Sequence, residues 1–77
     1  MEYTLEELEE MKQAILIAIP KEISARDFYL NAAKKFKTPE SIQLFLSLAD
    51  QEKGHEASLR KILAEIDANV RKLKNGK

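Results

Sequence analysis

The 77-residue chain contains no cysteine and no tryptophan, and it has only one histidine, two glycines and two prolines. The absence of cysteine excludes disulfides, thiolate metal sites, iron–sulfur clusters and thiol nucleophiles. Because His55 is the single histidine, a site that needs several imidazoles requires other subunits. The scarcity of glycine and proline, together with many Leu, Ala, Glu, Lys and Ile residues, indicates a helical protein.

Neither sign of charge predominates, because 13 Lys and Arg residues balance 13 Asp and Glu residues. This balance argues against nucleic acid or an anionic membrane as the main partner. The longest aliphatic run, residues 14–19, is too short to cross a bilayer, and the acidic start MEYTLEELEE does not resemble a signal peptide. We therefore expect a cytoplasmic protein with a single domain, residues 1–77, which is only marginally stable without a metal ion or a partner.

The pattern of apolar residues predicts two helices that form an antiparallel hairpin. Thr4 begins a capping box ahead of a 3.6-residue apolar period, which predicts a helix over about residues 5–36. Pro20 predicts either a kink in this helix or a break into two helices. Thr38, followed by proline and glutamate, predicts the start of a second helix over about residues 39–73. The short connection makes the two helices antiparallel neighbours.

Two carboxylates interrupt the apolar faces of these helices. On a helical wheel Glu22 and Glu52 each lie at the centre of the apolar stripe, and His55 lies about 60° from Glu52 on the same face. Both glutamates are about 22 Å from the turn, so we expect all three side chains in one layer. Ionised carboxylates there are unfavourable unless protonated, paired or bound to a metal, and a metal ion would use all three groups. Arg26 and Glu56 flank the layer and could orient the ligands or be ordinary rim residues.

One hairpin supplies too few ligands for two metal ions and leaves its apolar face uncovered. Two copies would supply four Glu and two His side chains, the ligand set of ferritin-like two-metal bundles. Oxygen and imidazole donors suit iron or manganese. We therefore expect an all-α protein whose antiparallel hairpin dimerises into a ferritin-like four-helix bundle. The partner is then a second copy, in a homodimer or a ring of dimers, with two iron ions per dimer.

Two segments of the chain resemble rubrerythrins. EISARDFYLNAA, residues 22–33, resembles their first bundle helix with its Glu-x-x-Ala-Arg-x-x-Tyr pattern. LFLSLADQEKGHEASL, residues 44–59, resembles the helix that carries Glu-x-x-His. The half-length arrangement is similar to that of the encapsulated ferritins, which also build a ferroxidase site between subunits.

This resemblance implies roles for four residues. It implies that Glu52 bridges two metal ions and that Glu22 and His55 are terminal ligands. It also implies that Tyr29 lies beside the site, where it could donate a hydrogen bond or an electron. The implied chemistry is oxidation of Fe(II) by dioxygen or peroxide, as in a ferroxidase or a peroxide scavenger. The sequence contains no Cys-rich electron-transfer module, so peroxide reduction would use an external electron donor.

The same residues also have plainer interpretations. Glu22 could be a solvated carboxylate exposed by a kink, Glu52 could lie on the surface, and His55 could be a half-buried core residue. Tyr29 could be a core aromatic residue whose hydroxyl group is hydrogen-bonded. Under these interpretations the chain is a metal-free helical hairpin that acts as a structural or assembly module.

Overall fold

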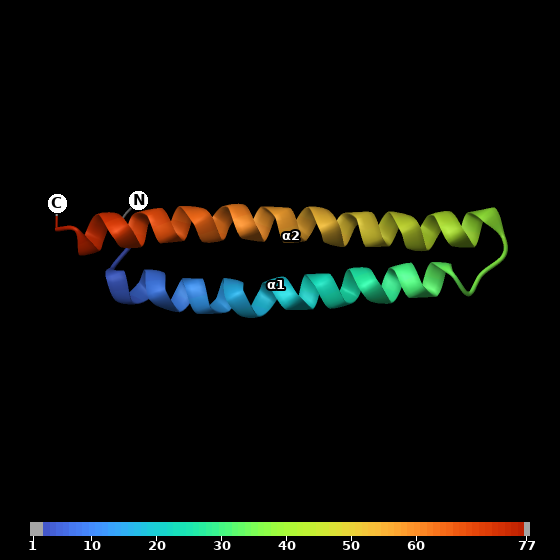
Figure 1. Cartoon of the computed structure of the whole chain (residues 1–77), viewed down its shortest axis with the longest axis horizontal. Coiled ribbons are helices and arrows are strands. Elements are labelled where there is room, and N and C mark those ends of the chain that lie inside the picture. The colour runs from blue at the N-terminus through green and yellow to red at the C-terminus, as the bar shows by residue number, and fades with distance from the viewer. Residues whose placement is uncertain (1–2, 77) are drawn as a thin grey trace.

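The computed structural model describes residues 3–76 and consists of two long antiparallel helices joined by a short turn (Figure 1). Helix α1 spans Leu5–Ala33 and helix α2 spans Pro39–Lys74. The hairpin measures 58 × 16 × 15 Å and has a radius of gyration of 17.3 Å. A compact domain of this length would have a radius of gyration of about 11.5 Å. Because the two helices meet along one seam, a large part of their surface stays uncovered.

Both helices begin at the caps that the sequence predicts. The Thr4 hydroxyl accepts a hydrogen bond from the backbone N–H of Glu7 at 3.0 Å. The Thr38 hydroxyl accepts one from the N–H of Ser41 at 3.3 Å. Each cap satisfies an N–H group that the first helical turn leaves free. Helix α1 continues through Pro20, so of the two alternatives, a kink or a break, the break is excluded. Pro20 is exposed, and water can bind the carbonyl that loses its helical partner there.

Helix α1 ends three residues before the predicted position, whereas α2 ends one residue beyond it. The N–H groups of Lys34 and Lys35 bond to carbonyls three residues earlier, at 3.2 and 3.0 Å, which closes a tight turn. Phe36, predicted to be helical, follows this turn, and its ring stacks on that of Phe45 in α2 with centroids 5.2 Å apart. Phe36 therefore packs against α2 in place of extending α1 by the further turn that the sequence predicts.

The seam between the helices repeats every seven residues, as in an antiparallel coiled coil. On α1 the repeat contains Leu8, Ile15, Glu22 and Tyr29, and on α2 it contains Phe45, Glu52, Leu59 and Ile66. The buried side chains are all apolar and lie on both sides of Glu22 and Glu52 along the seam, with Ile19 and Ala49 one turn from these glutamates: Leu8, Ile19, Ala33, Ala49, Ile66 and Val70. The middle of the seam therefore holds a polar layer between two apolar segments.

A second surface runs beside the seam on one side of both helices. It consists of Met11, Ala18, Ala25 and Ala32 of α1 and of Leu48, His55 and Ile62 of α2, each set again spaced by seven residues. We call these residues the open face. Ile62 is 40% exposed, and Phe28 and Leu44, at the edges of this surface, are 65% and 56% exposed. Within residues 3–76, neither helix is apolar enough over a sufficient length to span a membrane.

Candidate metal centre

Glu22, Glu52 and His55 meet in the polar layer at the middle of the hairpin. The Nδ1 atom of His55 lies 3.1 Å from Oε1 of Glu22 and 3.3 Å from Oε1 of Glu52. One possible ligand atom from each residue lies within 4.8 Å of the other two. Glu22 comes from α1, while Glu52 and His55 lie one turn apart on α2. The structure therefore brings the three proposed ligands from two helices to one level of the seam.

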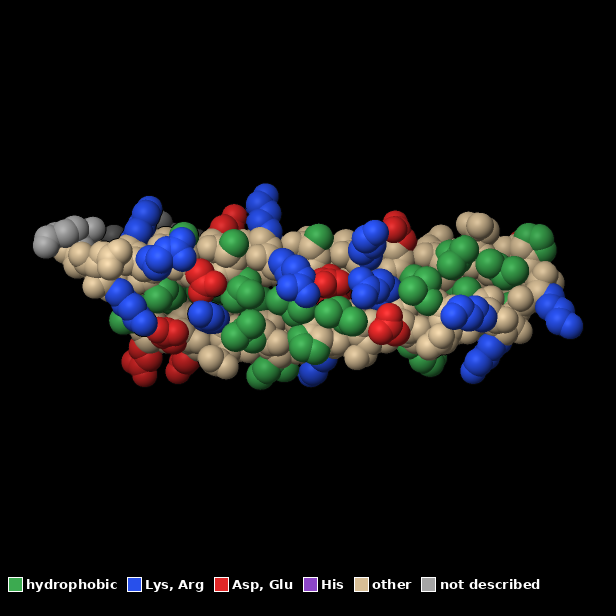
Figure 2. All heavy atoms as spheres, viewed as in Figure 1, with side chains coloured by type: hydrophobic (Ala, Val, Ile, Leu, Met, Phe, Trp, Pro, Cys, Tyr) green, Lys and Arg blue, Asp and Glu red, His purple; other side chains and the backbone are tan. Residues whose placement is uncertain are grey.

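The two carboxylates of the layer are half-buried in the seam, whereas the imidazole is exposed to solvent. The side chains of Glu22 and Glu52 are 26% and 19% exposed, whereas that of His55 is 62% exposed. Figure 2 shows acidic and basic side chains along the seam on one face of the hairpin, and no histidine is visible on that face. The helical position of His55, about 60° from Glu52, places it on the open face. The imidazole, predicted to face inward with the carboxylates, lies at the rim of the layer in a single chain.

Interactions among the three groups shift their pKa values. The pKa of Glu22 is raised, first because its carboxyl group hydrogen-bonds with that of Glu52 and then because burial disfavours its charge. The same bond lowers the pKa of Glu52, whose carboxylate is the acceptor. Hydrogen bonds to Glu52 and then to Glu22 raise the pKa of His55. A divalent cation bound to these atoms would replace the protons.

The donor atoms fit a first-row divalent metal ion. Carboxylate oxygens and imidazole nitrogens bind such ions at about 2.0–2.2 Å, so adjacent donors around one ion lie about 3 Å apart. The two Nδ1–oxygen separations, 3.1 and 3.3 Å, are in this range. The two carboxylates also occupy seam positions that the repeat otherwise fills with leucine, isoleucine or aromatic residues. Both observations are those expected of a metal site.

Tyr29, which the resemblance places beside the site, belongs to the same seam as Glu22. It follows Glu22 by seven residues, which corresponds to about 10.5 Å along the helix axis. Its ring packs against Phe28 and Phe45, with centroids 5.6 and 6.4 Å away. The structure therefore places Tyr29 in an aromatic cluster of the seam, and a role in electron transfer stays a prediction.

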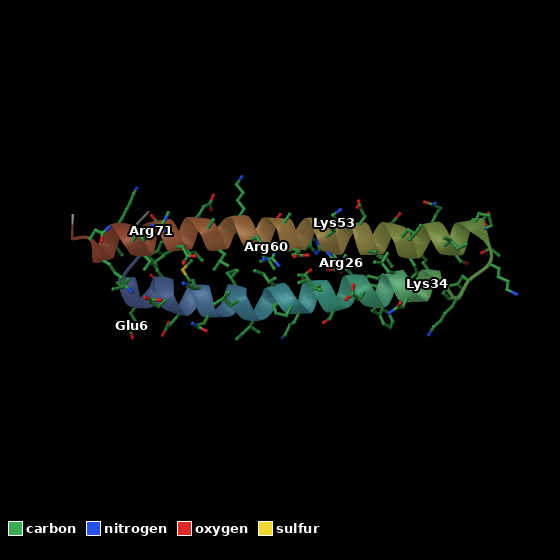
Figure 3. The ribbon with its side chains drawn as sticks, viewed as in Figure 1. Glu6, Arg26, Lys34, Lys53, Arg60 and Arg71 are labelled. Atoms are coloured by element: carbon green, nitrogen blue, oxygen red, sulfur yellow. The ribbon has the colours of Figure 1, made fainter. Side chains whose placement is uncertain are left out.

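A network of ion pairs crosses the seam beside the ligands. Arg26 Nη1 donates to Oε1 of Glu56 at 3.0 Å, and Arg60 Nε donates to Oε2 of the same residue at 2.8 Å. Figure 3 shows Arg26 and Arg60 between the two ribbons at the middle of the hairpin. The sequence singles out Arg26 and Glu56 but not Arg60. The available signal is the four-residue spacing of Arg60 from Glu56, which places the two side chains together on a helix.

Comparison with known proteins supports the resemblance noted in the sequence. The family model for rubrerythrin matches residues 13–77, which include both helices' proposed ligands. No curated protein and no solved structure matches the chain. The family match covers most of the chain and all three residues of the polar layer's donor cluster. The chain therefore belongs to the rubrerythrin family, whose members typically bind iron.

Proposed function

We propose that the chain is half of a two-iron carboxylate protein, in which two copies share a metal site and oxidise Fe(II) with dioxygen or peroxide. The proposal rests on the convergence of Glu22, Glu52 and His55 within 4.8 Å, at a level of the seam flanked by buried apolar residues. Membership of the rubrerythrin family supports iron as the metal. Manganese suits the same donor atoms.

The second copy follows from the number of ligands. One chain offers two carboxylates and one imidazole in this cluster. Two-metal sites in ferritin-like bundles use twice that set, from four helices. A second hairpin packed on the open face would supply the missing half and cover exposed residues such as Ile62. The small side chains of Ala18, Ala25 and Ala32 on that face would let a partner helix approach closely.

The three ligands would then have distinct roles. Following the family resemblance, Glu52 would be the carboxylate ligand shared by the two iron ions and Glu22 a terminal carboxylate ligand, and His55 would be a nitrogen ligand through Nδ1, which faces both carboxylates. To bind a metal, His55 must be neutral and Glu22 must lose the proton that it shares, so binding releases protons. Iron supplies reversible one-electron chemistry at this site, and four carboxylates from two chains balance the charge of two ferrous ions. Reduction of peroxide would also use an external electron donor.

Metal analysis combined with native mass measurement tests this proposal. Protein produced with iron should contain about one iron per chain, in a dimer or a multiple of dimers, and should consume Fe(II) faster than buffer alone. Glu52→Gln and His55→Ala should lose the bound iron and the activity. Glu65→Gln, an exposed carboxylate on α2, should keep both. A wild-type protein that binds iron without accelerating its oxidation would be a storage or binding module.

A second candidate function is a metal-free structural or assembly module. It is favoured by the hydrogen-bond contacts of His55 Nδ1 with Glu22 and Glu52, which can satisfy these polar groups within one chain. Thermal melting separates the two functions, because a ligand that binds only the folded state must raise the melting temperature. A rise with Fe(II) or Mn(II) supports the metal site. An unchanged melting temperature at saturating metal concentration supports the assembly module.

A further inference from the structure

We propose that Arg26, Glu56 and Arg60 form a positioning network that holds the two ligand-bearing helices at the separation the metal site requires. The inference rests on the metal site proposed above and assigns a role to residues outside its ligand set. Arg26 on α1 pairs across the seam with Glu56 on α2 at 3.0 Å, and Arg60 pairs with Glu56 along α2 at 2.8 Å.

The network lies at the level of the ligands on both helices. Arg26 follows Glu22 by four residues and Glu56 follows Glu52 by four, so these two residues are each one turn from a ligand. Helical side chains lean toward the N-terminus of their own helix, which brings Arg26 and Glu56 back toward the ligand layer from opposite directions. His55 lies about 60° to one side of Glu52, and Glu56 lies about 40° to the other. The ion pair therefore closes the layer on the side opposite His55.

The pairing between Arg26 and Glu56 is shielded from solvent more than the hairpin's other cross-helix pairs. Their side chains are 29% and 15% exposed. Those of the Lys12–Asp67 pair are 34% and 36% exposed. Because solvent and salt weaken exposed ion pairs most, the Arg26–Glu56 pair stabilises the contact between the helices more than the Lys12–Asp67 pair does.

Both carboxylate oxygens of Glu56 accept a hydrogen bond within the network. Its Oε1 accepts from Arg26 and its Oε2 accepts from Arg60, in two charge-assisted hydrogen bonds. Glu56 is also outside the cluster of possible ligand atoms formed by Glu22, Glu52 and His55. Its carboxylate therefore acts on the site through the positions of the helices, not by binding the metal.

Co(II) binding by Glu56→Gln and Asp67→Asn tests the network. Each variant converts a carboxylate on α2 to its amide and weakens one cross-helix pair of similar length, 3.0 and 2.9 Å. Asp67 is fifteen residues from Glu52, about 22 Å along the helix, and serves as the matched control. We expect Glu56→Gln to bind Co(II) about 10- to 100-fold more weakly and to change the visible absorption spectrum of bound Co(II). Asp67→Asn should change neither property.

The affinity for Co(II) and the absorption spectrum of bound Co(II) distinguish a positioning role from a general loss of stability. Both variants weaken one cross-helix ion pair, but only Glu56→Gln changes a residue one turn from a ligand. Unchanged Co(II) affinity and spectrum in Glu56→Gln would overturn the network while leaving the metal site intact. Failure of the wild-type protein to bind Co(II) would overturn the metal site itself. Arg60→Gln provides a second variant if Glu56→Gln does not fold, because Arg60 is 57% exposed and its loss leaves the Arg26–Glu56 pair in place. It should weaken binding by a smaller factor, and wild-type affinity in this variant would contradict the proposal.

Discussion

Leu8 is the most deeply buried large side chain of the hairpin, and its truncation should unfold the protein more easily without affecting the proposed metal site. Leu8 is 1% exposed and packs with Ile66 and Val70 near the end of the hairpin that carries the chain termini. Truncating a fully buried leucine to alanine costs about 2–5 kcal/mol, through lost transfer free energy and the cavity that remains. In an elongated hairpin the end can partly collapse, so we expect about 2–3 kcal/mol for Leu8→Ala. This corresponds to a fall in melting temperature of roughly 10–20 °C.

Urea denaturation with and without Mn(II) measures this effect. Leu8 is fourteen residues from Glu22, about 21 Å along α1, so its truncation and metal binding should be additive. The loss of unfolding free energy should therefore be the same in metal-free and metal-saturated protein, at equal protein concentration. Leu16→Ala is the control, because Leu16 is 41% exposed and its truncation should cost less than about 1 kcal/mol. A loss for Leu8→Ala no larger than this control, or a loss that depends on the metal, would refute the reasoning.

Four further predictions concern the site and its surroundings. Replacing both Glu22 and Glu52 with leucine should raise the melting temperature of the metal-free protein and abolish metal binding, because the seam is then apolar throughout; a lower melting temperature would contradict this. Gly54→Ala should raise the unfolding free energy by about 0.5–1 kcal/mol without changing metal affinity, since the added Cβ meets nothing within 4 Å. Ile62→Glu should weaken dimerisation, measured by sedimentation, if the open face is the dimer interface. Glu22 and Glu52 raise the pKa of His55, so its contribution to metal-free stability is full below about pH 6.5 and is lost as the pH rises through the raised value; denaturation of wild type and His55→Gln across this range measures it.

The sequence predicts the local structure well where a side chain bonds to its own helix. Thr4 and Thr38 cap the helices because a hydroxyl three residues before a free N–H group needs no distant partner. The depth of Glu22 and Glu52 is also predictable, since helical rise and the short turn fix their level. Their convergence with His55 follows from the same arithmetic.

Features that depend on contacts between the helices are harder to predict. Phe36 lies outside helix α1, and its ring stacks on that of Phe45 in α2. A contact between residues of different helices cannot be read from a local sequence pattern. Arg60 joins the site's surroundings only because Arg26 crosses the seam to the same carboxylate. The exposure of His55 depends on whether a second copy covers the open face. The metal ligation, the bound iron and the dimer remain predictions that the experiments above test.

The polar layer has a consequence for how the two helices align. Sliding α2 along α1 by one heptad, about 10.5 Å, would still place leucine and isoleucine side chains opposite one another along much of the contact. The slide would, however, bring Glu52 opposite an apolar residue and leave Arg26 without its acceptor. The hydrophilic centre of the hairpin therefore favours the same alignment that the short turn sets, and it penalises a slide that the apolar contacts alone would tolerate.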